Sequence, residues 1–155
     1  MRNSIYITAK KKTGLALLFM IVIVPLTFFV ACSDDDEFST EGISEIAGTW
    51  TATRATFNGI DVIEEGGTVT LTIQNNGRFT FKIKRPGRDD MVFTGRFGFD
   101  EQWLAVEYDI YPGEYEYYDI TYDEHNLHIG ANSEFDFDGN GTDEEVIFFL
   151  DMVRL

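Results

Sequence analysis

Residues 69–83, VTLTIQNNGRFTFKI, decide the fold class of this chain. Apolar side chains alternate with threonine before the segment Asn75-Asn76-Gly77 and with threonine or lysine after it. Alternation with a period of two is typical of a β-strand with one buried face. Asn and Gly tolerate the positive φ angles of tight turns, so this segment can join two strands. The stretch therefore predicts a β-hairpin.

The same alternation continues in both directions from this hairpin. Turn-forming pairs such as Pro86-Gly87 and Pro112-Gly113 interrupt it. After Ile46 no segment has the i, i+3, i+4, i+7 apolar spacing of an amphipathic helix. The sequence predicts an all-β domain with eight strands, at residues 48–57, 69–73, 79–84, 91–99, 103–111, 115–122, 127–137 and 146–155.

Short turns between consecutive strands predict an antiparallel up-and-down arrangement. Closing such a sheet into a barrel removes the exposed edges that promote aggregation. An open sandwich of two sheets is the alternative. In either case residues 46–155 form a single domain, because a chain of 155 residues leaves no room for a second one beside its N-terminal segments.

Three short segments resemble lipocalins and bacterial lipocalin-like lipoproteins. Gly48-Thr49-Trp50 is similar to the G-x-W motif of the first lipocalin strand, and residues 71–80 and 118–129 look like hairpins of the bacterial proteins. The resemblance implies an eight-stranded lipocalin-like barrel whose closed end is plugged by Trp50. It also implies a binding protein for a small apolar ligand.

Residues 1–31 have the order of a lipoprotein signal peptide. Lys10-Lys11-Lys12 precede a largely apolar run from Leu15 to Ala31, the arrangement of a secretory signal. An uncleaved membrane anchor is the alternative, because the run approaches the ~20 residues that span a bilayer. Pro25 interrupts the run, which favours the signal peptide.

Cys32 is the predicted lipidation site. Phe29-Val30-Ala31-Cys32 resembles a lipobox, whose cysteine receives diacylglycerol and fatty acids such as palmitate. The following Ser33-Asp34-Asp35-Asp36-Glu37 looks like the export signal of Bacteroidetes-type surface lipoproteins, with a solvated acidic linker as the alternative. The resemblance implies a lipid-anchored protein of the outer membrane, exposed at the cell surface. Residues 32–45 would then be the lipidated cysteine and a flexible acidic tether.

The charge of the chain limits its partners. All 27 acidic residues follow Ala31, whereas four of the 12 basic residues precede it, so the domain is more acidic than the net charge of −15 indicates. Such a charge repels phosphate backbones, which argues against nucleic acid as a partner. The membrane is an expected partner only through the lipid anchor.

Bulky aromatic side chains dominate the predicted interior of the barrel. An eight-stranded barrel is either filled by its own side chains or just wide enough for one small ligand. The sequence leaves both possibilities open. The aromatic residues expected to point inward are Trp50, Phe79, Phe81, Phe93, Phe97, Phe99, Tyr108, Tyr118 and Phe148.

The segment from Asp136 to Glu144 resembles a calcium loop. Ca²⁺ prefers six to eight oxygen ligands from a flexible loop. The expected ligands, at alternate positions of this loop, are Asp136, Asp138, Asn140, Thr142 and Glu144. Ile147 stands where such loops have a bidentate glutamate, so we expect weak affinity, in the ~10⁻⁴ to 10⁻³ M class. A metal-free hairpin turn around Gly139-Asn140-Gly141 is the alternative.

The sequence contains no recognisable catalytic motif. His125 and His128 are the only histidines, and their spacing places them on opposite faces of a strand. We therefore expect no enzyme, but a lipid-anchored binding protein for a small apolar ligand or for an envelope protein or glycan. A structural or accessory lipoprotein with a filled barrel is the alternative, and a carboxylate-dependent glycan hydrolase is a weaker one.

Overall fold

A computed structural model describes residues 39–155 of the protein. The predicted signal peptide, Cys32 and the acidic segment 33–37 lie outside the described residues. The secondary structure consists of α1 (Ile43–Ile46), β1 (Gly48–Phe57), β2 (Ile60–Asp61), β3 (Thr68–Ile73), β4 (Arg78–Lys84), β5 (Met91–Asp100), β6 (Trp103–Tyr108), β7 (Tyr115–Tyr122), β8 (Asn126–Phe135) and β9 (Glu144–Arg154). None of the helices found in residues 39–155 could cross a bilayer.

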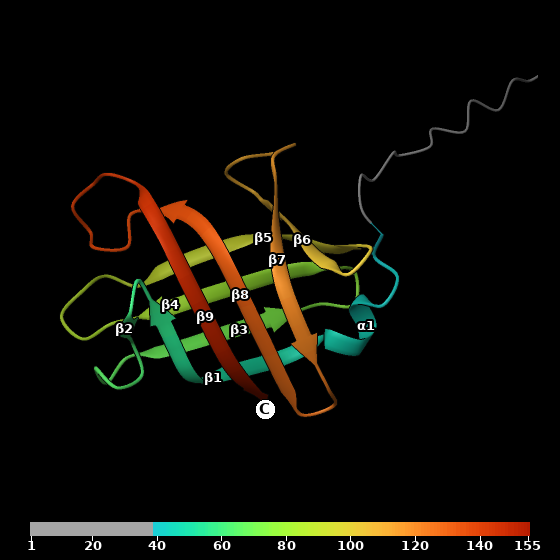
Figure 1. Ribbon diagram of the computed structural model, residues 1–155, viewed down its shortest axis with the longest axis horizontal. Helices are drawn as coiled ribbons and strands as arrows, with labels where there is room; N and C mark the ends of the chain where they lie inside the picture. The colour runs from blue at the N-terminus through green and yellow to red at the C-terminus, as the bar shows by residue number, and fades with distance from the viewer. Residues whose placement is uncertain (1–38) are drawn as a thin grey trace, which may run out of the picture. The chain divides into compact units, whose positions relative to one another are not determined.

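Eight of the strands form a closed antiparallel barrel (Figure 1). From β3 onward each strand pairs with the next along the chain, and β9 returns to β1. The pairs of this last ladder run from Trp50 and Arg154 to Phe57 and Phe148. The β1–β9 ladder excludes the open sandwich and confirms the eight-stranded up-and-down barrel. The short β2 is an addition that pairs with the end of β1 alone.

A bulge bends β1. Its first residues pair with β3 and its last with β2, while β9 pairs along most of its length. The register of the β1–β9 ladder shifts between Ala52 and Arg54, and the Thr53 hydroxyl donates to the Asp151 carbonyl. An extra residue in one strand increases local twist and bending. The bulge thus allows β1 to pair with both β3 and β9 and so to close the barrel.

Two glycines have conformations or neighbours in the barrel wall that a side chain would not allow. Gly77, with a φ of 82°, is the one residue of the 74–77 turn in the left-handed region, so the turn relies on Gly77 and not on the asparagines before it. Gly95 lies in β5 where a Cβ would meet the Glu107 carbonyl oxygen of β6 at 2.1 Å. A side chain at Gly95 would therefore separate the two strands.

The interior of the barrel is apolar and aromatic, as predicted. All nine aromatic side chains expected inside belong to the core or pack against it, with Phe93, Phe99 and Tyr108 half-buried at its margins. The Phe79 and Phe97 rings stack with centroids 4.0 Å apart. The cavity left in the middle of the barrel is only about 20 Å³. A water molecule is the most it could hold.

The folded domain begins before the predicted boundary at Ile46. Ser39 pairs with Phe99 of β5, and Ile43 of α1 is fully buried. Residues 39–45 therefore belong to the domain, and the predicted flexible tether is too long at this end. Two strands end earlier than predicted, β6 at Tyr108 and β8 at Phe135. The described residues belong to one compact unit, whose barrel closes within residues 48–154.

Candidate ligand pocket

One end of the barrel is closed by groups from both ends of the domain. Trp50 is fully buried and its indole Nε1 donates to the Ile46 carbonyl of α1 at 2.8 Å. The Arg154 guanidinium lies 4.1 Å from the centre of the Trp50 ring and donates to the backbone carbonyls of Glu45 and Ala47. Gly48 makes room for it, because a Cβ there would lie 2.8 Å from an Arg154 nitrogen.

The opposite end of the barrel contains a pocket of about 310 Å³. It reaches the loops β6–β7 and β8–β9, and Figure 1 shows the β8–β9 loop at the end away from α1. The apolar part of its wall includes Phe81, Met91, Phe93, Tyr108, Phe135 and Phe148. The barrel is therefore filled in its middle and hollow at one end.

Three polar side chains form a chain of hydrogen bonds beside the pocket, and two of them, Tyr108 and Glu116, line it. The Tyr108 and Tyr118 hydroxyls lie 2.7 Å apart, and the Tyr118 hydroxyl donates to Glu116 Oε2 at 2.6 Å. Tyr118 and Glu116 are two residues apart in β7, so both point into the barrel. Ser133 of β8, which also lines the pocket, is buried.

Burial keeps the two tyrosines of this chain protonated. Desolvation raises the pKa of Tyr108 to about 12, from its ordinary value of 10.0. Desolvation also raises the pKa of Tyr118, and the nearby Tyr108 and Glu116 add to the effect. An ionised phenol in an apolar wall would be costly. The hydroxyls therefore remain hydrogen-bond donors at all physiological pH values.

The barrel wall beside the pocket is incomplete. Strands β7 and β8 pair only through Asp119–Tyr122 and Leu127–Gly130. The first half of β7 pairs with β6, and residues 131–135 of β8 pair with β9, so these two segments diverge (Figure 1). A hollow of about 400 Å³ lies there, lined by Glu116, Asn132, Ser133, Glu134 and Glu145. This side opening of the wall shares Glu116, Ser133 and Glu134 with the pocket, so the two hollows adjoin.

The charged side chains that line the pocket are all carboxylates. They are Glu116, Glu134, Asp136 and Asp143. Lysine and arginine are absent from the lining among the described residues. The pocket is therefore apolar inside and negatively charged at its opening.

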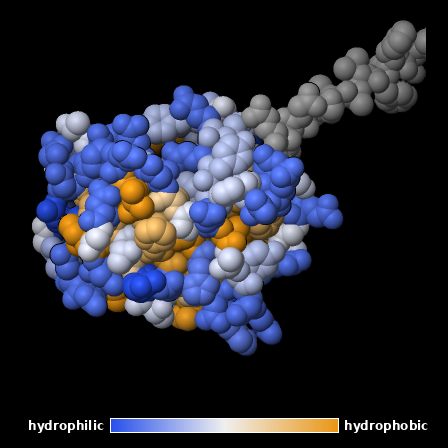
Figure 2. All heavy atoms as spheres, in the orientation of Figure 1, coloured by the Kyte–Doolittle hydropathy of each residue, from blue (hydrophilic) through white to orange (hydrophobic). Residues whose placement is uncertain are grey.

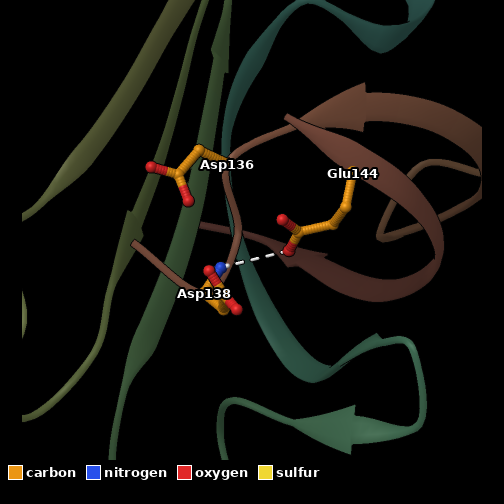
Figure 3. A group of neighbouring side chains, drawn as sticks. All are labelled: Asp136, Asp138 and Glu144. Carbon is orange, nitrogen blue, oxygen red and sulfur yellow. Dashed lines mark hydrogen bonds between the residues drawn. The ribbon is translucent and has the colours of Figure 1, made fainter. Parts of the chain in front are cut away.

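The predicted calcium loop brings the three carboxylates among its five expected ligands together. Carboxylate oxygens of Asp136, Asp138 and Glu144 lie within 4.8 Å of one another (Figure 3). The Asp138 N–H donates to Glu144 Oε1 at 3.2 Å, as the dashed line in Figure 3 marks. These carboxylates are oxygen donors of the kind that Ca²⁺ prefers. Calcium binding in this loop remains a prediction.

The other contacts of the loop explain how it folds without an ion. Both Asp136 carboxylate oxygens accept backbone N–H groups, from Asn140 and from Gly141, each at 2.9 Å. The Asn140 side-chain oxygen accepts the Thr142 N–H at 2.8 Å, so Asn140 and Thr142 contact each other. Ile147, in place of the last calcium ligand, is half exposed on the outer face of β9. The donor set fits a weak cation site at most.

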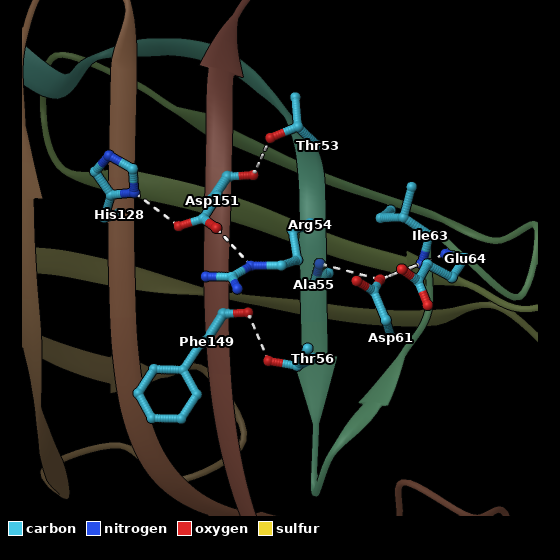
Figure 4. Close-up of polar contacts among 10 residues, drawn as sticks. All are labelled: Thr53, Arg54, Ala55, Thr56, Asp61, Ile63, Glu64, His128, Phe149 and Asp151. Atoms are coloured by element: carbon cyan, nitrogen blue, oxygen red, sulfur yellow. Dashed lines mark hydrogen bonds and ion pairs between the residues drawn. The ribbon is translucent and has the colours of Figure 1, made fainter.

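The two histidines lie apart, as expected from their spacing. The His125 N–H belongs to the β7–β8 turn and donates to Asp123. His128 lies on the outer face, where its Nδ1 is 2.8 Å from Asp151 Oδ1, and Arg54 binds the other oxygen at 2.6 Å (Figure 4). Hydrogen bonds with His128 and Arg54 lower the pKa of Asp151. This cluster joins β8, β9 and β1 across the closing ladder.

The outer face of β9 also carries exposed apolar side chains. Ile147 and Phe149 are 50% and 55% exposed. Figure 2 shows apolar atoms gathered in the middle of the face over β8 and β9, surrounded by polar residues. This patch lies on the outside of the wall and does not line the pocket.

The sequence patterns do not single out the polar groups of the pocket, Glu116 and Ser133, as site residues. A signal for Glu116 was present, because it shares the alternation of Tyr118, which was expected to point inward. The side opening was not predictable in this way, because it depends on where β7 stops pairing with β8.

Comparisons with models of protein families, with curated proteins and with solved structures found no match. The resemblance of the sequence segments to lipocalin-like lipoproteins stays a prediction, and the barrel bears on its fold alone. Function has to be argued from the pocket.

Proposed function

We propose that this protein is a small-molecule binding protein without catalytic activity. The observation that carries the proposal is the pocket at the open end of a barrel that is otherwise filled. Its volume of about 310 Å³ lies at the small end of the ~300–1,000 Å³ typical of ligand pockets. Its wall combines aromatic side chains with a few converging polar groups, the usual composition of such sites.

Native mass spectrometry tests this proposal directly. The protein from Ser33 to Leu155 contains the whole described domain and lacks the lipidated cysteine. Incubated with an envelope extract of its host and repurified, it should retain a small molecule, and Phe135→Trp should reduce that retention by filling the pocket. The matched control is Phe149→Trp, on the outer face. Equal retention by both variants would place the ligand elsewhere.

We further propose that the domain is carried by a lipid on Cys32 at the outer membrane and is exposed to the cell surface. The support is the signal-like segment, the lipobox-like residues and the acidic segment after them. Cys32→Ser should abolish labelling by radioactive palmitate and release the protein from the membrane fraction. Retention of the unlabelled variant in that fraction would contradict the anchor.

A structural or accessory role is the second candidate. The observation that favours it is the filled middle of the barrel, where the cavity measures only about 20 Å³. In this case the outer patch around Phe149 would be the functional surface. A protein that binds no small molecule, but loses an envelope partner on Phe149→Ser, would support this role over ligand binding.

A further inference from the structure

We infer that the pocket selects ligands that combine an apolar body with a protonated amine. This inference rests on the proposed function and specifies its ligand class. It depends on one side chain, Glu116, and on the charge and ring faces around it.

Glu116 is a carboxylate placed at an inward position of the wall. In β7 it shares the inward face with Tyr118 and Ile120, and it pairs with Val106 of β6, which is fully buried. Glu116 itself is half-buried and lines both the pocket and the side opening. A ligand that covers this carboxylate removes it from water, which is costly unless the ligand compensates its charge.

Only one of the two Glu116 carboxylate oxygens has a hydrogen-bond partner among the described residues. Oε2 accepts the hydrogen bond of the Tyr118 hydroxyl at 2.6 Å. Oε1 accepts no hydrogen bond from residues 39–155 in the structure, and Glu116 forms no ion pair with a described lysine or arginine. A ligand ammonium could donate to Oε1 while its apolar body remains in the pocket, and charge-assisted hydrogen bonds of this kind are strong.

The surroundings of Glu116 favour a cation over other head groups. Glu134, Asp136 and Asp143 line the same pocket and repel an anion. The rings of Phe93, Tyr108 and Phe135 form much of the wall, and aromatic faces attract ammonium groups. An amine with an apolar body matches both properties of the pocket.

A divalent metal ion fits this position less well. In the described part of the chain, the carboxylates that can converge on one ion are Asp136, Asp138 and Glu144, and Glu116 is not among them. Glu116 faces aromatic side chains and tyrosine hydroxyls instead. A hard cation needs several oxygen ligands, whereas an ammonium needs few.

The test uses three probes with one apolar body. Naphthylethylamine, naphthylethanol and naphthylacetate are titrated at neutral pH into the protein from Ser33 to Leu155, with calorimetry as the readout. The amine should bind about 10- to 100-fold more tightly than the alcohol, the range for one hydrogen bond to a charged group. The acetate should bind most weakly.

Two variants assign the preference to Glu116. Glu116→Gln can still accept the Tyr118 hydroxyl, so the fold should persist and the alcohol should bind as before. The amine should lose its advantage over the alcohol. Glu124→Gln, in the β7–β8 turn at the closed end, removes the same charge and should leave the preference intact.

The outcomes separate the inference from the function on which it rests. Equal binding of amine and alcohol by the unaltered protein would overturn the inference and leave a general apolar pocket. A preference that survives Glu116→Gln would also overturn it. Failure of all three probes to bind, in a protein that also retains no small molecule, would overturn the proposed function.

Discussion

The closed and open ends of the barrel are built from the same alternating strands but are finished differently. At the closed end, α1, Trp50 and Arg154 meet, and Trp50 is fully buried. At the open end, β7 and β8 diverge and the loops leave a pocket of about 310 Å³. The comparison shows that strand number alone does not determine whether a small barrel is hollow. Side-chain size and strand separation determine it locally.

The largest expected effect comes from breaking the closed end. Trp50→Ala removes a fully buried indole and its hydrogen bond to Ile46. The free energy of unfolding should fall by about 3–5 kcal/mol, the range for such truncations. Urea denaturation followed by circular dichroism measures it. Trp103→Ala, at a partly exposed position, is the control, and a similar loss in both variants would contradict a special role for Trp50.

A smaller loss should follow Arg154→Met. Arg154 stacks on Trp50 and donates to the Glu45 and Glu124 carbonyls at 2.8 Å each. Hydrogen bonds to charged groups contribute about 1.5–3 kcal/mol, so the free energy of unfolding should fall by about 2 kcal/mol.

Arg54→Met provides the matched control for Arg154. The Arg54 side chain is 58% exposed and makes one ion pair with Asp151. Such surface pairs contribute about 0–1 kcal/mol. If urea denaturation gave the same loss for both arginines, the closed end would not depend on Arg154.

High pH should destabilise the folded protein through Tyr108 at the open end. The pKa of Tyr108 is about 12 in the folded protein and 10.0 in its ordinary state. Because the folded value is the higher one, the stabilisation is complete below pH 10 and is lost as the pH rises toward 12. The loss should be about 1.4 kcal/mol per pH unit for this group.

Denaturation midpoints at a series of alkaline pH values measure this decline. Tyr108→Phe should make it shallower, because the variant has no phenol to ionise at this position. An unchanged slope would show that Tyr108 ionises as easily in the folded protein as in the unfolded chain.

The smallest effect is expected from calcium at the β8–β9 loop. With a dissociation constant in the predicted ~10⁻⁴ to 10⁻³ M class, about 1 mM Ca²⁺ should stabilise the protein by about 0.4–1.4 kcal/mol. Thermal unfolding with and without Ca²⁺ measures the shift. Asp136→Asn should remove it, whereas Asp89→Asn should not. A shift that is the same in both variants would exclude this loop as the site.

The sequence predicted the barrel because its signals are local and repeated. The hairpin around Gly77 and the alternation in each later strand define which side chains point inward. The interior aromatics such as Phe79 and Phe97 followed from this alternation alone. Closure was inferred from the cost of open edges, and the β1–β9 ladder confirms it.

The features that close one end of the barrel and leave a pocket at the other were not predictable from local sequence patterns. In α1, Ile43 and Ile46 are buried, but a single turn is too short to show a helical period. Arg154 contacts Trp50 across more than a hundred residues of sequence, and no local pattern reports such a contact. The pocket depends on the divergence of β7 from β8, which the alternation of either strand does not reveal.

The pairing of β1 with β9 also has a consequence for how the chain folds. Partners such as Arg54 and Asp151 are 97 residues apart, so the barrel cannot close until β9 is available to pair with β1. Contacts of such high sequence separation form slowly. Under the proposed export across a membrane, this order would keep a stable barrel from forming until β9 has followed β1 through the membrane.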